Sequence, residues 1–519
     1  MVIDYLKQDE KLKPFYQHPV SLEGIKASIA ARRQTNNYRQ LLVDVLRKQY
    51  QDIALNSLQQ HNLDKLLEEN TFTITTAHQP NLFTGHLYFI YKILHTVKLS
   101  NYLAGELPGN YFVPFFYMGS EDADLEELGH INFNGEKLEW NTQQTGAVGR
   151  MIVDKELLKL VDRMAAELEV MDFGKELMDI LRSAYTIGTT IQQATLVLVN
   201  ELFAAFGVLV LIPDNADLKR PFNEIVKREL VEQFSHPLVE ETAEQLGKHY
   251  KVQASGRDIN LFYLLEDNRE RIEKNSDKYE VKSLRLQWTQ EELLNEVDEH
   301  PERFSANVIL RGVFQEMILP NIAFIGGGGE LAYWLELKKV FEACGVPYPI
   351  LVLRNSFLLV KNEQVEKLKK LNFSVEDFFK PEMDLVNQLV KNETTLQLSL
   401  DKEKEQLHHY YTQLRQVVQA IDVSLNDHVL SLQAKAAKAI DALEKKMLRA
   451  EKKKFDAQQR QVHKLREQLF PNNNLQERID NFAPYYAAQG KNWIKAIYDC
   501  SLALEQEFGI CTLMNENKS

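Results

Sequence analysis

The sequence predicts an α/β protein with a split, doubly wound parallel sheet, helical insertions and a C-terminal antiparallel coiled-coil hairpin. Two segments, 71–135 and 321–354, each have the order strand, loop, helix, strand, which is typical of a parallel βαβ unit. Helical patterns dominate the insertion between them, about 136–300. From about 385 to 470, glycine and proline are absent and apolar residues recur at steps of three and four, as in coiled-coil helices.

Composition and charge limit the functional classes. The chain has 519 residues, 44% hydrophobic and 26% charged, which suits a globular protein of two or three structural units. Its net charge of −13 argues against general nucleic-acid binding. Polar residues interrupt the most apolar window, 194–213, and the charged N-terminus lacks the apolar core of a signal peptide. We therefore expect a cytoplasmic protein without nucleic-acid or membrane partners.

The cysteines and histidines predict neither disulfides nor a zinc site. Cys344, Cys500 and Cys511 are odd in number and form no Cys-x-x-Cys pair, which fits a reducing compartment. No His-Glu-x-x-His or comparable ligand spacing appears either. We therefore expect no metal held by protein ligands alone.

The first 135 residues predict packing helices followed by the first βαβ unit. Residues 1–70 have an amphipathic helical pattern and are expected to pack on the core. A β-rich run, 71–79, ends at a proline; an apolar helical stretch, 86–103, and a second β-rich run, 111–118, follow. Because ligands of parallel sheets bind at the carboxyl ends of the strands, the residues after each run are candidates for a site.

Polar residues follow both strands of this unit. The candidates after the first strand are His78, Gln79, Thr84, Gly85 and His86, and those after the second are Glu121, Asp122, Asp124 and His130. The carboxylates could hold a substrate ammonium, act as a general base or bind Mg²⁺. An exposed acidic loop without a function is the alternative.

A histidine beside a glycine at a helix start can contact nucleotide phosphates. The segment Phe83-Thr84-Gly85-His86 is similar to the His-x-Gly-His signature of class I aminoacyl-tRNA synthetases and nucleotidylyltransferases, which steadies charge during adenylate formation. Phe83 stands where that signature has its first histidine. A structural or capping histidine is the alternative.

The second βαβ unit carries four consecutive glycines, Gly326, Gly327, Gly328 and Gly329, between a strand at 321–325 and a helix at 330–343. Glycines let backbone N–H groups approach an anion closely, so this loop is a candidate phosphate site. The spacing is not G-x-G-x-x-G, no Walker Lys-Ser/Thr follows, and Arg354 ends the next strand, which disfavours a dinucleotide site. A turn needed only for packing is the alternative.

Arg311 and Gln315 lie in an otherwise apolar stretch just before this unit. Polar residues in such stretches are usually buried and paired. They either line the site or tie the sheet together.

The C-terminal part is expected to leave the core and return to it. Turn-forming residues at 422–427 favour two antiparallel helices within 385–470 over one long rod. A helical bundle packed on the core is the alternative. Residues 471–519 resume a mixed sequence and are expected to contact the core again.

Several ordered motifs together resemble one family. They are AHQPNLFTGHLYFIYK, SEDADLEELGH, LRGVFQEMILPNIAFIGGGGELAYW, the strand ending in Arg354, and LFPNNNLQER. In this order, and over nearly the whole chain, they are similar to the bacillithiol-biosynthesis cysteine-adding enzymes, the BshC family. The sequence departs from that family at Ala123, where a histidine is usual, at Gly328, where a proline is usual, and at His86, where a proline is frequent.

The resemblance implies a fold, an activity and partners. It implies a class I synthetase-like Rossmann core over 71–380, and a coiled coil that supports a homodimer. It implies a cysteine ligase that joins cysteine to the amine of glucosaminyl malate and so forms bacillithiol. An amide-forming ligase must activate the carboxylate of cysteine, which implies ATP with Mg²⁺ as the companion of the nucleotide. Adenylation is the form of activation that a class I-like core implies.

The site residues expected on this basis fall into three groups. Glu121, Asp122, Asp124, His78 and His86 are expected to be catalytic, and Gly326–Gly329 to bind the nucleotide. The residues expected to bind substrates are Gln79, Thr84, Gly85, Tyr88, His130, Arg311, Gln315, Glu330, Tyr333, Trp334 and Arg354. Two other functions stay open on the sequence: a nicotinamide-dependent oxidoreductase on a Rossmann core, and a non-catalytic coiled-coil assembly protein.

Overall fold

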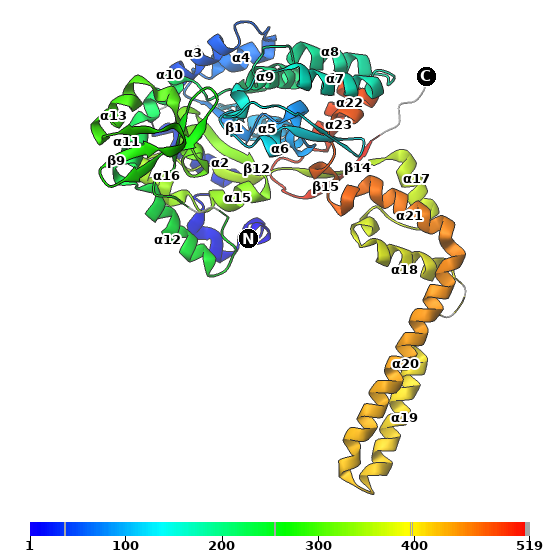
Figure 1. The fold of residues 1–519 in the computed structure, drawn as a ribbon. Coiled ribbons are helices and arrows are strands. Elements are labelled where there is room, and N and C mark those ends of the chain that lie inside the picture. Colours follow the sequence, from blue (N-terminus) through cyan, green and yellow to red (C-terminus); the bar gives the residue numbers. More distant parts are fainter. Residues whose placement is uncertain (36–37, 254–255, 395, 397, 514–519) are drawn as a thin grey trace. The chain divides into compact units, whose positions relative to one another are not determined.

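The computed structural model describes residues 1–35, 38–253, 256–394, 396 and 398–513 (Figure 1). The described chain forms two compact units. The first contains Met1–Leu358 and Glu477–Cys511, and the second contains Leu359–Gln476 with Thr512 and Leu513. Residues far apart in the sequence therefore complete the first unit.

A five-stranded parallel sheet forms the core of the first unit, in the order β13-β12-β1-β2-β5. The strands are β1 (Thr71–His78), β2 (Tyr111–Met118), β5 (Leu209–Leu211), β12 (Asn321–Gly326) and β13 (Ile350–Leu353). Every neighbouring pair is parallel. The strands are almost fully buried and rich in β-branched and aromatic residues, as expected of a sheet covered on both faces. The prediction of one split sheet from two βαβ units is confirmed.

The strand order reverses between β1 and β12. From β1 the chain proceeds through helix α5 (Tyr88–Glu106) to β2, and from β12 it proceeds in the other direction to β13. Helix α5 is apolar on nearly all sides, which is typical of a buried helix. Such a reversal leaves a crevice at the carboxyl ends of the two strands, where open α/β sheets bind ligands.

Further helices lie in the N-terminal segment and around the second βαβ unit. The N-terminal ones are α1 (Val2–Leu6), α2 (Leu22–Arg33), α3 (Arg39–Gln49) and α4 (Ser57–Lys65), of which α2 packs on β12 and β13. Helix α14 (Val308–Ile318) precedes β12. The single helix predicted over 330–343 is two helices, α15 (Gly328–Trp334) and α16 (Lys338–Cys344).

The segment between β2 and α14 contains more strands than predicted. Its helices are α6 (Leu125–Leu128), α7 (Lys155–Leu168), α8 (Gly174–Ala184), α9 (Ile191–Phe203), α10 (Ala216–Lys219), α11 (Asn223–Glu232), α12 (Ser235–Gly247) and α13 (Gln290–Glu299). Its further strands are β3 (His130–Phe133), β4 (Glu136–Glu139), β6 (Leu261–Leu264), β7 (Arg269–Arg271), β8 (Glu273–Asn275), β9 (Lys278–Val281), β10 (Leu286–Trp288) and β11 (Phe304–Ala306). They form one hairpin and two three-stranded sheets. Strands of three or four residues are too short to show a period in the sequence, so helical patterns obscured them.

The second unit contains the helical hairpin. Helices α19 (Asp401–Gln419) and α20 (Asn426–Lys452) run side by side (Figure 1), with the turn at Val423–Leu425 between them. The ammonium of Lys404 forms ion pairs with Asp441 and Glu444, which fixes the antiparallel register. The predicted hairpin and its turn are confirmed. The other helices of this unit are α17 (Asn362–Lys370), α18 (Glu382–Glu393) and α21 (Asp456–Leu469).

None of the described helices combines the length and the apolar character needed to cross a membrane.

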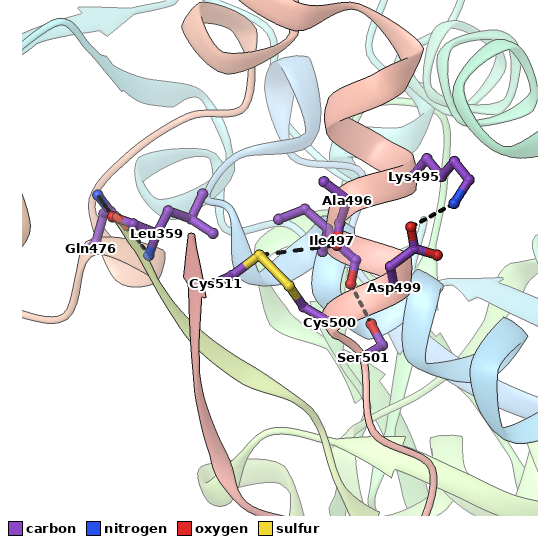
Figure 2. Close-up of a disulfide and its surroundings, with 9 residues drawn as sticks. All are labelled: Leu359, Gln476, Lys495, Ala496, Ile497, Asp499, Cys500, Ser501 and Cys511. Atoms are coloured by element: carbon purple, nitrogen blue, oxygen red, sulfur yellow. Dashed lines mark hydrogen bonds and ion pairs between the residues drawn. A yellow bond between two sulfur atoms is a disulfide. The ribbon is translucent and has the colours of Figure 1, made fainter. Parts of the chain in front are cut away.

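The C-terminal part of the chain carries helices α22 (Ala483–Gln489) and α23 (Lys491–Cys500) and strand β15 (Phe508–Leu513), which pairs with β14 (Ser356–Lys361). The expectation of reduced thiols is wrong for two cysteines. Cys500, at the end of α23, and Cys511, in β15, form a disulfide with their Cα atoms 6.1 Å apart (Figure 2). The ten residues between them reverse the direction of the chain. No short sequence motif predicts that these two cysteines lie close together. Cys344 is a free thiol, and burial raises its pKa to about 12.

Candidate functional site

A cavity of about 340 Å³ lies at the carboxyl ends of β1 and β12, where the strand order reverses. Its lining residues come from both βαβ units and from the returning C-terminal segment. They include Ala77, His78, Gln79, Tyr88, Tyr117, Gly119, Glu127, Arg311, Gln315, Gly327, Gly328, Gly329, Glu330, Tyr333, Trp334, Arg354 and Arg478. The sheet topology therefore places segments about 250 residues apart in one crevice, as the general rule for open α/β sheets requires.

The glycine loop between β12 and α15 borders this cavity. The N–H of Gly327 donates to the Glu330 carboxylate at 2.8 Å, so one glycine N–H is occupied by the first turn of α15. Gly328 and Gly329 also line the cavity, and a Cβ atom on Gly329 would meet nothing within 4 Å. The loop therefore has space on its cavity side for a ligand to approach the backbone.

Glu330 forms an ion pair with a buried lysine. The Lys92 ammonium, on α5, donates to Glu330 Oε2 at 2.7 Å and to the carbonyl of Ala77 at 2.5 Å. Burial favours the neutral carboxyl, but Lys92 and the Gly327 N–H outweigh it and hold the pKa of Glu330 below its ordinary value. Glu330 therefore stays ionised at neutral pH.

His78, the last residue of β1, lines the cavity as a neutral imidazole. Its Nδ1 lies 3.1 Å from the carbonyl oxygen of Gln79, which assigns the proton to Nδ1 and leaves Nε2 as an acceptor. Burial and then the charge of Lys92 lower its pKa to about 4. The ring centroids of Tyr88 and Phe89 each lie 5.5 Å from that of the imidazole.

Asp122 is an ion-pair partner rather than a free base. Its carboxylate accepts from Arg311 at 2.6 Å and lies 3.7 Å from the Arg269 guanidinium. Burial opposes ionisation, but the two arginines outweigh it and lower the pKa of Asp122. The same pair raises the pKa of Arg311 further above its already high value. Asp122 thus fixes Arg311, which reaches the cavity from α14.

A second cavity of about 860 Å³ adjoins the first, because Gln79, Glu127, Val308 and Arg311 line both. Asp122, Asp124, Arg257 and Arg269 contribute to its other walls. Burial, followed by the charges of Asp124 and Asp122, raises the pKa of Glu127. A carboxylate with a raised pKa at the junction of two cavities is suited to accept a proton between them.

Two arginines from distant segments border the first cavity. Arg354, after β13, forms a buried ion pair with Glu477 at 2.8 Å, and its guanidinium lies 5.1 Å from the centre of the Tyr88 ring. Arg478 is exposed and also lines the cavity. Guanidinium groups bind carboxylates and phosphates in a planar, forked geometry, so this side of the cavity is suited to an anionic ligand.

Most of the predicted residues border one of the two cavities. Twelve line the first: His78, Gln79, Tyr88, Arg311, Gln315, Gly327, Gly328, Gly329, Glu330, Tyr333, Trp334 and Arg354. Asp122 and Asp124 line the second.

The other predicted residues have different surroundings. Glu121 bonds Ser305 at 3.0 Å and forms an ion pair with Lys219, while His130 Nδ1 lies 2.8 Å from the carbonyl of Glu126. Gly326 is a buried part of β12. None of these three appears in the lining of either described cavity.

The loop around Thr84 and Gly85 is fixed to the C-terminal segment rather than directed at the cavity. Asn481 donates to the carbonyls of Phe83 and Gly85 at 2.9 and 2.6 Å, and His86 Nδ1 lies 3.2 Å from the carbonyl of Ile479. Thr84 is fully buried. The segment that is similar to the synthetase signature therefore attaches the loop after β1 to the C-terminal segment in this structure.

Sequence reasoning missed several residues that border or support the cavity. They are Lys92, Tyr117, Glu127, Arg269 and Arg478. Lys92 had a signal, because a charged residue inside an apolar helix is usually paired. Arg478 lies in the LFPNNNLQER motif.

Among the described residues, no group of three His, Cys, Asp or Glu side chains could hold a metal ion.

Comparison with known proteins identifies the family. Residues 1–355 match the family "Bacillithiol biosynthesis BshC, N-terminal Rossmann-like domain", and residues 357–513 match "Bacillithiol biosynthesis BshC, C-terminal coiled-coil domain". A protein of Flavobacterium johnsoniae named "Putative cysteine ligase BshC" is 39% identical over 99% of this chain and 97% of its own length. Proteins of the same name from Flavobacterium psychrophilum and Christiangramia forsetii are 38% identical (98% of this chain, 96% of theirs) and 36% identical (99% and 97%). With both domains and nearly the full length matched, this chain belongs to the BshC family.

Proposed function

We propose that this chain is a cytoplasmic, ATP-dependent ligase that joins the carboxyl group of cysteine to the amine of glucosaminyl malate. The observation that carries the proposal is the cavity at the strand reversal of a BshC-family Rossmann core. It combines a glycine loop, three arginines and a carboxylate with a raised pKa.

The chemistry requires two steps. An oxygen of the cysteine carboxylate attacks the α-phosphorus of ATP, an O–P bond forms, the bond from the α-phosphorus to the bridging oxygen breaks, and pyrophosphate leaves. The amine nitrogen of glucosaminyl malate then attacks the activated carbonyl carbon. The C–N bond forms, the C–O bond to AMP breaks, and the proton of the amine passes to a base.

The residues of the cavity suit these tasks. The backbone of Gly329 is open enough to approach nucleotide phosphates, and Gly328 lines the same cavity. Because Arg311 and Arg354 already bind Asp122 and Glu477, the exposed Arg478 is the best placed guanidinium for a malyl carboxylate. Glu127 is the base, since the arginines around Asp122 hold that carboxylate ionised and weakly basic.

The purified protein tests the proposal directly. Incubated with ATP, Mg²⁺, cysteine and glucosaminyl malate, it is expected to form bacillithiol and release AMP and pyrophosphate in equal amounts. Thiol derivatisation with mass spectrometry measures the product, and chromatography measures the nucleotides. Release of ADP and phosphate would show that the activated intermediate is an acyl phosphate and not an adenylate. Absence of the thiol product with every substrate present would contradict the ligase assignment.

We also propose that the α19–α20 hairpin carries a homodimer contact. Val417, Ile421 and Val423 are 60%, 76% and 69% exposed near the tip of the hairpin. Exposed apolar side chains at the end of α19 and in the turn that follows it favour a protein partner.

A further inference from the structure

We propose that Lys92 is a positioning residue of this active site: its buried ammonium ties the end of β1 to the glycine loop through Glu330. The inference rests on the proposed ligase function. It concerns a residue that touches no substrate and acts through Glu330 and His78.

Three elements meet at this ammonium. Lys92 lies in the second turn of α5 and is 1% exposed. Its Nζ atom donates to the Ala77 carbonyl, on the peptide bond that precedes His78, and to Oε2 of Glu330. The same Glu330 oxygen accepts the Gly327 N–H. One ammonium thus connects the carboxyl ends of β1 and β12, the two strands at the reversal point.

Stability alone does not explain a buried lysine here. Removing an ammonium from water costs more free energy than an ion pair commonly returns, and apolar replacements of buried pairs are often neutral or stabilising. The other buried side chains of α5 are mainly apolar, so a charged group at position 92 is an exception within this helix. The charge of Lys92 is therefore better explained by its contacts, which fix the positions of Glu330 and His78 at the edge of the cavity.

The position of the ammonium also explains the state of His78. A positive charge bonded to the preceding carbonyl disfavours an imidazolium. The other charged or titratable groups that act on His78 are Glu330, which favours the imidazolium, and His86, which opposes it. Burial and Lys92 outweigh Glu330, so the Nε2 lone pair of His78 remains available inside the cavity.

A second buried ion pair provides the matched control. Arg32, on α2, bonds Glu316, on α14, at 2.9 Å, and their side chains are 2% and 0% exposed. Neither residue lines a described cavity. Arg32→Met therefore reports what the loss of a buried charge does to folding without touching the proposed site.

The test uses Lys92→Met, Lys92→Arg and Arg32→Met in the full chain. Thermal unfolding establishes that each variant folds. Lys92→Met is expected to lower kcat of ligation by about 100-fold or more, with Lys92→Arg partly restoring it. Arg32→Met is expected to change kcat only as far as its folded fraction falls. The proposal is wrong if Lys92→Met, once folded, keeps wild-type kcat.

An NMR titration of His78 gives a readout that needs no activity. With labelled histidine, and His78→Gln to assign the signal, the wild-type imidazole is expected to stay neutral from pH 5 to 8. In Lys92→Met its pKa should rise from about 4 toward 6.5. An unchanged pKa would overturn the inference even if ligation fails. If Lys92→Met does not fold, Glu330→Gln breaks the same ion pair by removing the carboxylate. Because that carboxylate favours the imidazolium, the pKa of His78 should then fall further. An inactive wild-type protein would instead contradict the ligase proposal.

Discussion

The chemistry of each side chain in the cavity depends on its partners. Asp122, Glu330 and Glu127 are all acidic, but the first two are ionised by neighbouring cations and only Glu127 has a raised pKa. Residue type alone therefore does not predict these differences in pKa, because three carboxylates of similar intrinsic acidity differ in what surrounds them.

Glu127→Gln is expected to lower kcat of ligation by about 100-fold or more, because general-base catalysis contributes about 10²–10⁴-fold. In the wild type, kcat should fall as the pH falls through the raised pKa of Glu127, since the base must be deprotonated. Glu136→Gln is the control, because Glu136 is exposed and lines neither of the two cavities. Equal losses in both variants would contradict the role given to Glu127.

Arg478→Gln is expected to raise the KM for glucosaminyl malate and to leave the KM for cysteine unchanged. A charge-assisted contact is worth about 1.5–3 kcal/mol, which corresponds to roughly 10–100-fold. Steady-state kinetics with each substrate varied in turn measure the difference. A change in the KM for cysteine alone would assign Arg478 to the other substrate.

At the scale of elements, the loop after β1 has an unusual backbone. Phe83, Thr84 and Gly85 all have positive φ angles, of 49°, 66° and 66°. The ψ of −126° at Gly85 lies in a region that residues with a Cβ atom avoid, and an added Cβ would approach Asn81 Cβ to 2.9 Å. This glycine is required by the conformation of the loop.

Gly85→Ala is therefore expected to lower the free energy of unfolding by about 1–3 kcal/mol. Gly105→Ala, in the last turn of α5, is the control, since nothing lies within 4 Å of its added Cβ. That change should be neutral or stabilise the protein by up to about 1 kcal/mol. Denaturant unfolding of both variants measures the difference, and similar values would contradict the argument.

The disulfide joins two C-terminal elements of the first unit. Without reductant, denatured protein should therefore react with an alkylating reagent only at Cys344, and after reduction at all three cysteines. Mass spectrometry counts the labels. The variant Cys500→Ser should lose about 2–4 kcal/mol of stability in the absence of reductant and little in its presence. Three labels without reductant would show that the bond does not form.

At the scale of the whole molecule, the proposed homodimer depends on the second unit. Ile421→Glu is expected to convert a dimer into a monomer, because a charge cannot be buried unpaired in an apolar contact. Val170→Glu is the control, since Val170 is 86% exposed in the first unit. Light scattering after size-exclusion chromatography measures the mass. A wild-type monomer, or an unchanged mass for Ile421→Glu, would contradict this contact.

The sequence by itself determined the parallel sheet and the helical hairpin. Each is encoded in a long segment with a strong local pattern, such as the β-branched run Thr71–His78 or the glycine-free stretch of the coiled coil. It also indicated twelve residues that line the first cavity, because strand ends and glycine loops have local signatures.

Only the tertiary structure decided which of these groups act together. It joined Lys92 to Glu330 across 238 positions and Arg354 to Glu477 across 123. It removed His86 from the cavity by fixing it to Ile479, and it paired Cys500 with Cys511. The physical reason is that pKa, burial and ion pairing depend on distances between atoms, and residues far apart in the chain acquire those distances only when the sheet assembles.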